Sequence, residues 1–185
     1  DRLTWSQCLL AALEQVDTPL VLYFQEDYFI QRPVLADKVR RAAAYMVENP
    51  EVKHIQLTKL GSSGPHEPYK ESWLAQIRQH AKYRLSTQAA LWRTETLKSY
   101  LVPEENGWMF EIYGAWRARR RLDRFLCARF DAEWGGPAID YLHTGIIKGK
   151  WLREIRSVFE QNGIEIDYAK RGFYSPKHAV LPRVE

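Results

Sequence analysis

Short apolar runs of strand length alternate with helical patterns through residues 4–57, and this alternation constrains the fold more than any other feature. Leu20–Phe24 is continuously apolar, which is typical of a strand buried on both faces in the middle of a parallel sheet. Apolar residues at helical spacing precede it in Leu9–Val16 and follow it in Leu35–Met46. Val52–Leu57 is then predicted to form a second strand. This order predicts an α/β fold with a mostly parallel or mixed sheet flanked by helices.

The same rules predict the remaining elements. Thr4 and Gln7 have the spacing of a capping box at the first helix, and Pro33 suits the first turn of the second helix. The further predictions are a loop over Gly61–Pro68, a helix over Tyr69–Ala81, an alternating strand over Tyr83–Leu91, a helix over Thr94–Leu101, a helix over Trp108–Arg120, strands over Phe125–Phe130 and Ala138–Leu142, and a helix over Trp151–Gln161. We expect one domain over residues 1–185, with residues 170–185 as a C-terminal extension.

The composition excludes several classes of protein. A hydrophobic content of 45% excludes a disordered chain, and the longest apolar runs are too short to span a bilayer. Cys8 and Cys127 lie far apart, each in an apolar segment, which predicts reduced core residues in a cytosolic protein. No Cys/His spacing fits a zinc site. The net charge of +4 is mild and no nucleic-acid motif is present, so we expect no nucleic-acid partner.

Five arginines are clustered after residue 116: Arg117, Arg119, Arg120, Arg121 and Arg124. The simplest interpretation is the solvated face and end of a helix. The alternatives are binding of an anionic ligand such as a diphosphate, or contact with an anionic membrane surface.

The acidic pair Glu26 and Asp27 directly follows the first apolar run. Ligands of open α/β sheets bind beyond the carboxyl ends of the strands. Two adjacent carboxylates repel each other unless a cation or a hydrogen-bond donor offsets the repulsion. A hard divalent cation carrying a diphosphate would do so, since it prefers oxygen ligands. The alternative is that one carboxylate caps a turn and the other is solvated.

A second candidate is Glu111, which follows the turn Pro103–Gly107. Trp108 and Glu111 are three residues apart on a predicted helix and therefore share a face. A carboxylate beside Trp108 and Phe110 would be desolvated, which suits a general base. The alternative is an ordinary glutamate near a helix N-terminus, where the helix dipole favours it.

Four segments stand out in this order: Leu20–Phe29, Tyr83–Trp92, Pro103–Glu111 and Lys148–Trp151. Together they resemble a glycosyltransferase family from bacterial capsule, O-antigen and lipopolysaccharide biosynthesis clusters. The first resembles a hydrophobic strand followed by Asp-Asp-Phe-Phe, and the second resembles Tyr-Arg-Val-Ser-Leu-Gln-x-Ala-Ile-Trp. The third resembles Glu-x-x-Trp-x-Phe-Glu and the fourth Gly-Lys-Trp.

The resemblance implies a glycosyltransferase-A fold, a nucleotide-sugar donor, Mg²⁺ or Mn²⁺, and a saccharide or glycolipid acceptor. We expect a cytoplasmic protein, and the arginine cluster is a candidate for peripheral contact with the inner membrane. By position, Glu26 and Asp27 would bind the metal and Glu111 would be the acceptor-side base. The implied substrate-binding residues are Trp108, Trp92, Gln88 and Ser86, and the residues expected at the nucleotide sugar are Arg171 and Lys150.

The chain departs from the family pattern at two places. Its acidic pair is Glu-Asp rather than Asp-Asp, and the strand–helix repeats that hold the nucleotide base are not found before Asp1. The second departure is expected either of a truncated chain or of a chain that departs from the glycosyltransferase-A fold. Two alternatives to a transferase also stay open. One is a catalytically inactive carbohydrate-binding or scaffolding domain, and the other is a glycoside hydrolase that uses Glu111 and an acidic partner.

Overall fold

The computed structural model describes residues 2–130 and 136–176. The chain divides into two compact units. Unit 1 comprises Asp1–Gln25 and Arg32–Asp140, and unit 2 comprises Glu26–Gln31 and Tyr141–Glu185. The second unit therefore takes up the acidic pair as well as the C-terminal part of the chain.

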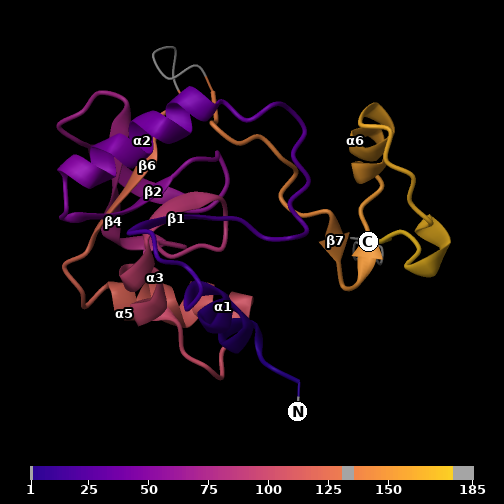
Figure 1. Ribbon diagram of the computed structural model, residues 1–185, viewed down its shortest axis with the longest axis horizontal. Helices are drawn as coiled ribbons and strands as arrows, with labels where there is room; N and C mark the ends of the chain where they lie inside the picture. Colours follow the sequence, from indigo (N-terminus) through magenta and orange to yellow (C-terminus); the bar gives the residue numbers. More distant parts are fainter. Residues whose placement is uncertain (1, 131–135, 177–185) are drawn as a thin grey trace, which may run out of the picture. The chain divides into compact units, whose positions relative to one another are not determined.

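Unit 1 is a mixed six-stranded sheet with helices on both faces (Figure 1). Its elements are α1 (Trp5–Leu13), β1 (Leu20–Tyr23), α2 (Ala36–Glu48), β2 (Val52–Gln56), β3 (Gly64–Pro68), β4 (Leu74–Lys82), β5 (Ala90–Arg93), α3 (Thr94–Tyr100), α4 (Gly107–Met109), the π-helical η1 (Phe110–Gly114), α5 (Ala115–Ala118) and β6 (Arg124–Ala128). The strand order is β1-β5-β2-β6-β4-β3, with β2 and β6 parallel and the other neighbours antiparallel. The predicted α/β class and mixed sheet are confirmed.

The apolar run at residue 20 forms an edge strand, so the prediction of a central parallel strand is wrong. β1 lies at the end of the strand order and pairs with β5 in antiparallel register, Leu22 opposite Leu91. Leu22 is 40% exposed. An apolar run shows that a strand is suited to burial, but its neighbours in the sheet depend on segments far along the chain.

The region between β2 and β5 also differs from the sequence prediction. Part of the predicted loop is strand β3, and the helix predicted over Tyr69–Ala81 is instead strand β4. Ile77 and Ala81 are four residues apart and both are buried. Four residues is close to one helical turn and is also two full periods of a strand, so this spacing fits both structures. The strand predicted over Tyr83–Leu91 forms only at its end, in β5.

Several boundaries match the predictions. The capping box of α1 is present, because Gln7 N donates to Thr4 Oγ1 and Thr4 N donates to Gln7 Oε1. The predicted helices over α2, α3 and residues 107–118 form, as do strands β2 and β6. The strand predicted over Ala138–Leu142 is reduced to a bridge between Tyr141 and Ile30. The last predicted helix begins at Ile155 rather than Trp151.

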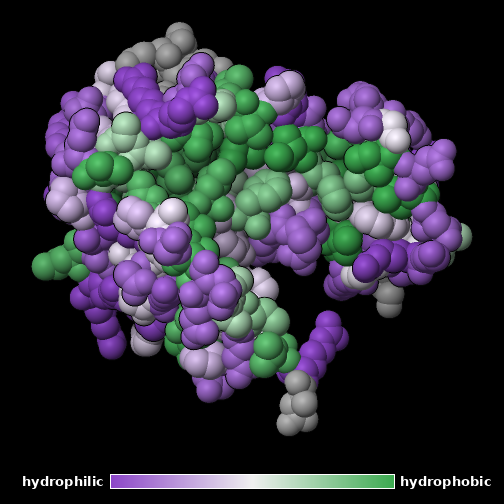
Figure 2. All heavy atoms as spheres, viewed as in Figure 1, coloured by the Kyte–Doolittle hydropathy of each residue, from purple (hydrophilic) through white to green (hydrophobic). Residues whose placement is uncertain are grey.

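The main core lies on one face of the sheet, under α1, α3 and the 107–118 helix, while α2 covers the other face (Figure 1). Its largest fully buried side chains include Trp92, Tyr100, Phe110 and Phe125. The surface in view mixes hydrophilic and hydrophobic residues (Figure 2). Both cysteines are free; Cys127 is buried as predicted, but Cys8 is exposed, so its predicted core position is wrong.

Unit 2 is small and has its own core. Its elements are the hairpin strands β7 (Ile146–Ile147) and β8 (Lys150–Trp151), helix α6 (Ile155–Gln161) and the 3₁₀ turn η2 (Tyr168–Lys170). Ile155, Val158 and Phe159 form the core, against which Phe29 and Trp151 pack. Among the helices of residues 2–130 and 136–176, none combines the length and the apolar character needed to cross a bilayer.

Candidate functional site

Glu111 is anchored through one of its two carboxylate oxygens. Its Oε1 accepts hydrogen bonds from Ser86 Oγ at 3.1 Å, Thr87 N at 2.7 Å and Thr87 Oγ1 at 2.9 Å. Within the described ranges 2–130 and 136–176, no donor bonds to Oε2. The carboxylate is therefore held in a fixed orientation while one oxygen stays available to a ligand, which is the arrangement that a positioned general base requires.

Buried Arg84 holds the segment that supplies these donors. Its guanidinium donates to Ile77 O at 2.7 Å and to Asp123 O at 2.6 Å, and it lies 4.9 Å from the ring centroid of Phe125. Arg84 is only 3% exposed. These contacts tie residues 83–89 to β4 and to the start of β6, so that the next two polar residues, Ser86 and Thr87, face Glu111.

The helix that carries Glu111 approaches the same segment closely. A Cβ added at Gly114 would lie 2.9 Å from Leu85 Cδ2, so this approach depends on glycine. Glu111 and Gly114 both belong to the π-helical turn η1, and such turns are frequent at functional sites. The start of the helix is fixed by Asn106, whose side chain accepts from Met109 N at 2.9 Å.

An ion pair between Arg117 and a buried carboxylate holds the preceding turn against this helix. Arg117 donates to both oxygens of Glu105, at 2.6 and 2.7 Å, and to Tyr100 O at 2.9 Å. Glu105 is only 6% exposed. Arg117 therefore has a structural role, and it is not available for an anionic ligand.

The other predicted sugar-binding residues do not gather around Glu111 as a group. Ser86 contacts Glu111 directly, and Gln88 is buried beside it, with its backbone N donating to Ser86 Oγ at 3.2 Å. Trp92 has no exposed surface and packs against His54 and Phe125. A side chain without exposed surface cannot stack on a sugar, so Trp92 belongs to the core and its predicted role is wrong.

The surroundings of Glu111 also differ from the apolar ones expected. Trp108 is 67% exposed on the helix surface, and three polar donors face Glu111 Oε1. The sequence reasoning missed Thr87, which supplies two of these donors. Its position directly after Ser86 in the chain is a signal that could have identified it.

The predicted metal ligands Glu26 and Asp27 lie in unit 2. Asp27 Oδ2 accepts from Thr144 Oγ1 at 2.5 Å, and its backbone O accepts from Gly145 N at 2.7 Å. Asp27 Oδ1 is buried and has no hydrogen-bond partner among the described residues, whereas Glu26 is exposed. One carboxylate thus supports the loop before β7, which agrees with the alternative in which one acid stabilises a turn and the other is solvated.

These two residues do not fit a cation held by the protein alone. No group of three or more His, Cys, Asp or Glu side chains suited to a metal occurs in the described part of the chain. Magnesium is commonly bound by one or two carboxylates with substrate phosphates completing the sphere, so only Asp27 Oδ1 hints at a ligand here. We therefore assign no chemical step to a metal.

The two predicted nucleotide-sugar contacts also lie in unit 2. Lys150 lines a cavity of about 410 Å³ together with Lys148 and Tyr174. The hairpin that presents both lysines turns at Lys148 and Gly149, which have φ angles of 49° and 76°. Positive φ at both central residues suits a tight hairpin turn. Arg171 lies with its guanidinium 5.8 Å from the ring centroid of Trp151.

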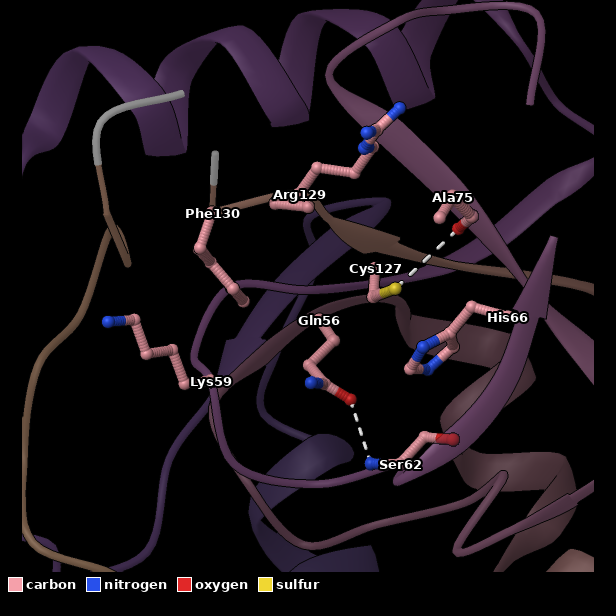
Figure 3. Close-up of a pocket in the computed structure, with 9 residues that line it drawn as sticks. Gln56, Lys59, Ser62, His66, Ala75, Cys127, Arg129 and Phe130 are labelled. Carbon is pink, nitrogen blue, oxygen red and sulfur yellow. Dashed lines mark hydrogen bonds between the residues drawn. The ribbon is translucent and has the colours of Figure 1, made fainter. Parts of the chain in front are cut away.

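A cavity of about 380 Å³ in unit 1 was not predicted (Figure 3). It lies at the carboxyl ends of the parallel neighbours β2 and β6, where ligands of α/β sheets bind. Its volume lies within the range of small-molecule sites. The lining residues are Gln56, Lys59, Ser62, His66, Ala75, Cys127, Ala128, Arg129 and Phe130.

The chemistry of this cavity is polar and cationic. Ser62 N donates to Gln56 Oε1 at 3.0 Å, and Cys127 Sγ donates to Ala75 O at 3.7 Å (Figure 3). Burial raises the pKa of Cys127 to about 11 and lowers the pKa of His66, so at neutral pH the thiol is protonated and the imidazole is neutral. With Lys59 and Arg129 as its charged lining residues, the cavity suits a small polar or anionic ligand.

The arginine cluster separates into paired and exposed members. Besides Arg117, Arg121 pairs with Asp123 at 2.8 Å and Arg124 with Glu51 at 3.3 Å. Arg119 and Arg120 are exposed and form no ion pair with a residue in the described ranges. The cluster is therefore not one continuous cationic patch.

Comparison with known proteins found no similar protein. No protein-family model matches the chain, and neither the curated proteins nor the solved structures contain a match.

Proposed function

We propose that the protein transfers a sugar from a nucleotide-sugar donor to a saccharide or glycolipid acceptor, with Glu111 as the base. The observation that carries the proposal is the hydrogen-bonded contact between two of the four family-like segments. Tyr83–Trp92 supplies Ser86 and Thr87, and Pro103–Glu111 supplies the carboxylate that both residues bind. Two segments that are separate in sequence thus meet at the residue expected to remove a proton.

The proposed reaction is a direct displacement at the anomeric carbon of the donor sugar. The acceptor hydroxyl oxygen bonds to that carbon as the bond from the carbon to the diphosphate breaks. Glu111 Oε2 takes the hydroxyl proton, while Ser86 and Thr87 hold Oε1 and so aim Oε2. A base held in this way contributes through orientation as well as proton transfer.

The finer parts of the proposal rest on the resemblance. They are the glycosyltransferase-A form of the fold, donor contacts from Lys150 and Arg171, and the divalent cation. Lys150 has a second cation, Lys148, at the same cavity, and this supports an anionic ligand there. The cation remains a prediction, since Glu26 and Asp27 do not by themselves form a metal site.

Glu111→Gln tests the proposal. Gln keeps a carbonyl oxygen that accepts from Thr87 N, so we expect the fold to be retained. Transfer from a panel of nucleotide sugars to oligosaccharide acceptors should fall by about 10²–10⁴-fold, while the thermal shift on donor binding should be unchanged. Glu104→Gln removes an exposed carboxylate from the preceding turn and is the matched control.

Unchanged turnover in Glu111→Gln would remove Glu111 from the mechanism. Glycan binding without donor binding would favour the inactive carbohydrate-binding domain. Hydrolysis of glycans without any activated donor would favour the glycoside hydrolase.

A further inference from the structure

The 107–118 helix exposes four large apolar side chains, which we call the aromatic face. They are Trp108 (67% exposed), Ile112 (38%), Tyr113 (49%) and Trp116 (60%). Trp108, Ile112 and Trp116 are four residues apart, a spacing that keeps helical residues on one side. Single exposed apolar residues are normal on protein surfaces, but four within nine positions of one helix mark an interaction site.

The opposite side of the same helix is also apolar. Phe110, Gly114, Ala115 and Ala118 are buried against the rest of unit 1. A surface helix ordinarily has one apolar stripe facing the core and a polar face toward water. Packing within unit 1 therefore accounts for one apolar side of the helix and leaves the aromatic face unexplained.

Cations adjoin the aromatic face at the C-terminal end of the helix. Arg119 and Arg120 are exposed, and the Arg120 guanidinium lies 5.1 Å from the ring centroid of Trp116. Leu122, just beyond them, is fully exposed. Tryptophan, tyrosine and arginine together are the residues that anchor proteins at the boundary between lipid headgroups and acyl chains.

We propose that the aromatic face, with Arg119, Arg120 and Leu122, binds an anionic lipid surface. The aromatic rings would enter the headgroup boundary and the two arginines would pair with lipid phosphates. Charge favours an anionic lipid surface, because Arg119 and Arg120 are exposed beside the aromatic face and form no ion pair with a described residue. The proposal does not depend on the transferase activity.

Vesicle co-sedimentation of the full chain tests the proposal. The vesicles contain phosphatidylglycerol mixed with phosphatidylcholine, or phosphatidylcholine alone. We expect binding to the anionic vesicles that decreases as salt is added. Each arginine near an anionic surface contributes about 1 kcal/mol, which is about fivefold in the partition coefficient. Arg119→Gln with Arg120→Gln should therefore weaken binding by about 25-fold.

A second double variant, Trp108→Ser with Trp116→Ser, should abolish most of the binding while leaving the thermal unfolding temperature unchanged, because both side chains are exposed. Val47→Ser and Arg40→Gln are the matched controls, since both residues are exposed on α2. These controls should bind vesicles as the wild type does.

Three results would overturn the proposal. They are the absence of binding to anionic vesicles, binding that the tryptophan variant leaves intact, and equal binding to phosphatidylcholine alone. Light scattering gives a further check, because self-association that the tryptophan variant abolishes, without vesicle binding, would assign the aromatic face to a second copy of the chain.

Discussion

His54 lies in the centre of the sheet and should make the stability of the protein depend on pH. It is 2% exposed in β2, and its ring centroid lies 4.5 Å from that of Trp92 and 5.2 Å from that of Phe125. Burial, and to a smaller extent the charge of Arg84, lower the pKa of His54 to about 3. The folded protein therefore keeps this imidazole neutral at every pH near neutrality.

The direction in which stability changes with pH follows from the number of protons that the folded and unfolded states bind. In the unfolded chain a histidine has a pKa of about 6.5, so below this pH the unfolded state binds a proton that the folded state does not. The stability associated with neutral His54 is complete above pH 6.5 and is lost as the pH falls toward 3. The loss is about 1.4 kcal/mol per pH unit, or about 2 kcal/mol between pH 7 and pH 5.

Urea unfolding at pH 7 and pH 5 measures this loss in the wild type and in His54→Phe, which keeps an aromatic ring but cannot titrate. We expect the wild type to lose about 2 kcal/mol more than the variant over this range. His80→Gln removes an exposed histidine and should behave as the wild type does. Equal losses in the wild type and His54→Phe would refute the reasoning, and His54→Gln provides the same comparison if the phenylalanine variant does not fold.

Three further predictions concern Glu111 and the segments that support the site and the cavity. Arg117→Met should lower the free energy of unfolding by about 2–4 kcal/mol in urea titration, because it leaves the buried Glu105 carboxylate without its partner. Gly61→Ala should lower the free energy of unfolding by about 2 kcal/mol in the same titration. Gly61 has φ 109°, and a Cβ there would lie 2.6 Å from a side-chain oxygen. Thr87→Val removes one donor from Glu111 and should slow transfer by about tenfold, measured as kcat, if Glu111 is the base.

Two of these predictions have a matched control, and the third has a direct contradicting outcome. Arg119→Met removes an exposed arginine that forms no ion pair with a described residue and should leave stability unchanged, so an equal loss there would contradict the role of the Arg117–Glu105 pair. Gly163→Ala tests backbone conformation alone, because Gly163 has φ 64° and no atom of the described part of the chain lies within 4 Å of an added Cβ. This variant should lower the free energy of unfolding by only about 1 kcal/mol. A rate in Thr87→Val equal to that of the wild type would show that the hydroxyl does not position Glu111.

The helices were predictable because their signals are local. The capping box of α1 lies within four residues, and the end of α2 at Asn49 directly precedes Pro50. Strand β4 was not predictable in the same way. The spacing of Ile77 and Ala81 fits a helix and a strand, and only pairing with β3 and β6 selects the strand.

The candidate site shows the same division between local and distant information. Glu111 and Ser86 were identified as candidates from sequence, and the structure brings them into contact. Thr87 was missed, and Trp92 was assigned to a sugar pocket although it lies in the core. Chemical type shows what a side chain is able to do, but its burial depends on elements that pack against it from elsewhere in the chain.

The sequence by itself determined the α/β class, the main helices and the residue types suited to proton transfer, because these follow from spacing and chemistry over a few residues. The tertiary structure decided which strand lies at the sheet edge, that Glu26 and Asp27 belong to a different unit from Glu111, and that Arg117 pairs inward while Arg119 does not. These outcomes depend on contacts between segments that are distant in the chain. Whether such contacts form is set by the packing of the whole unit, which no local pattern specifies.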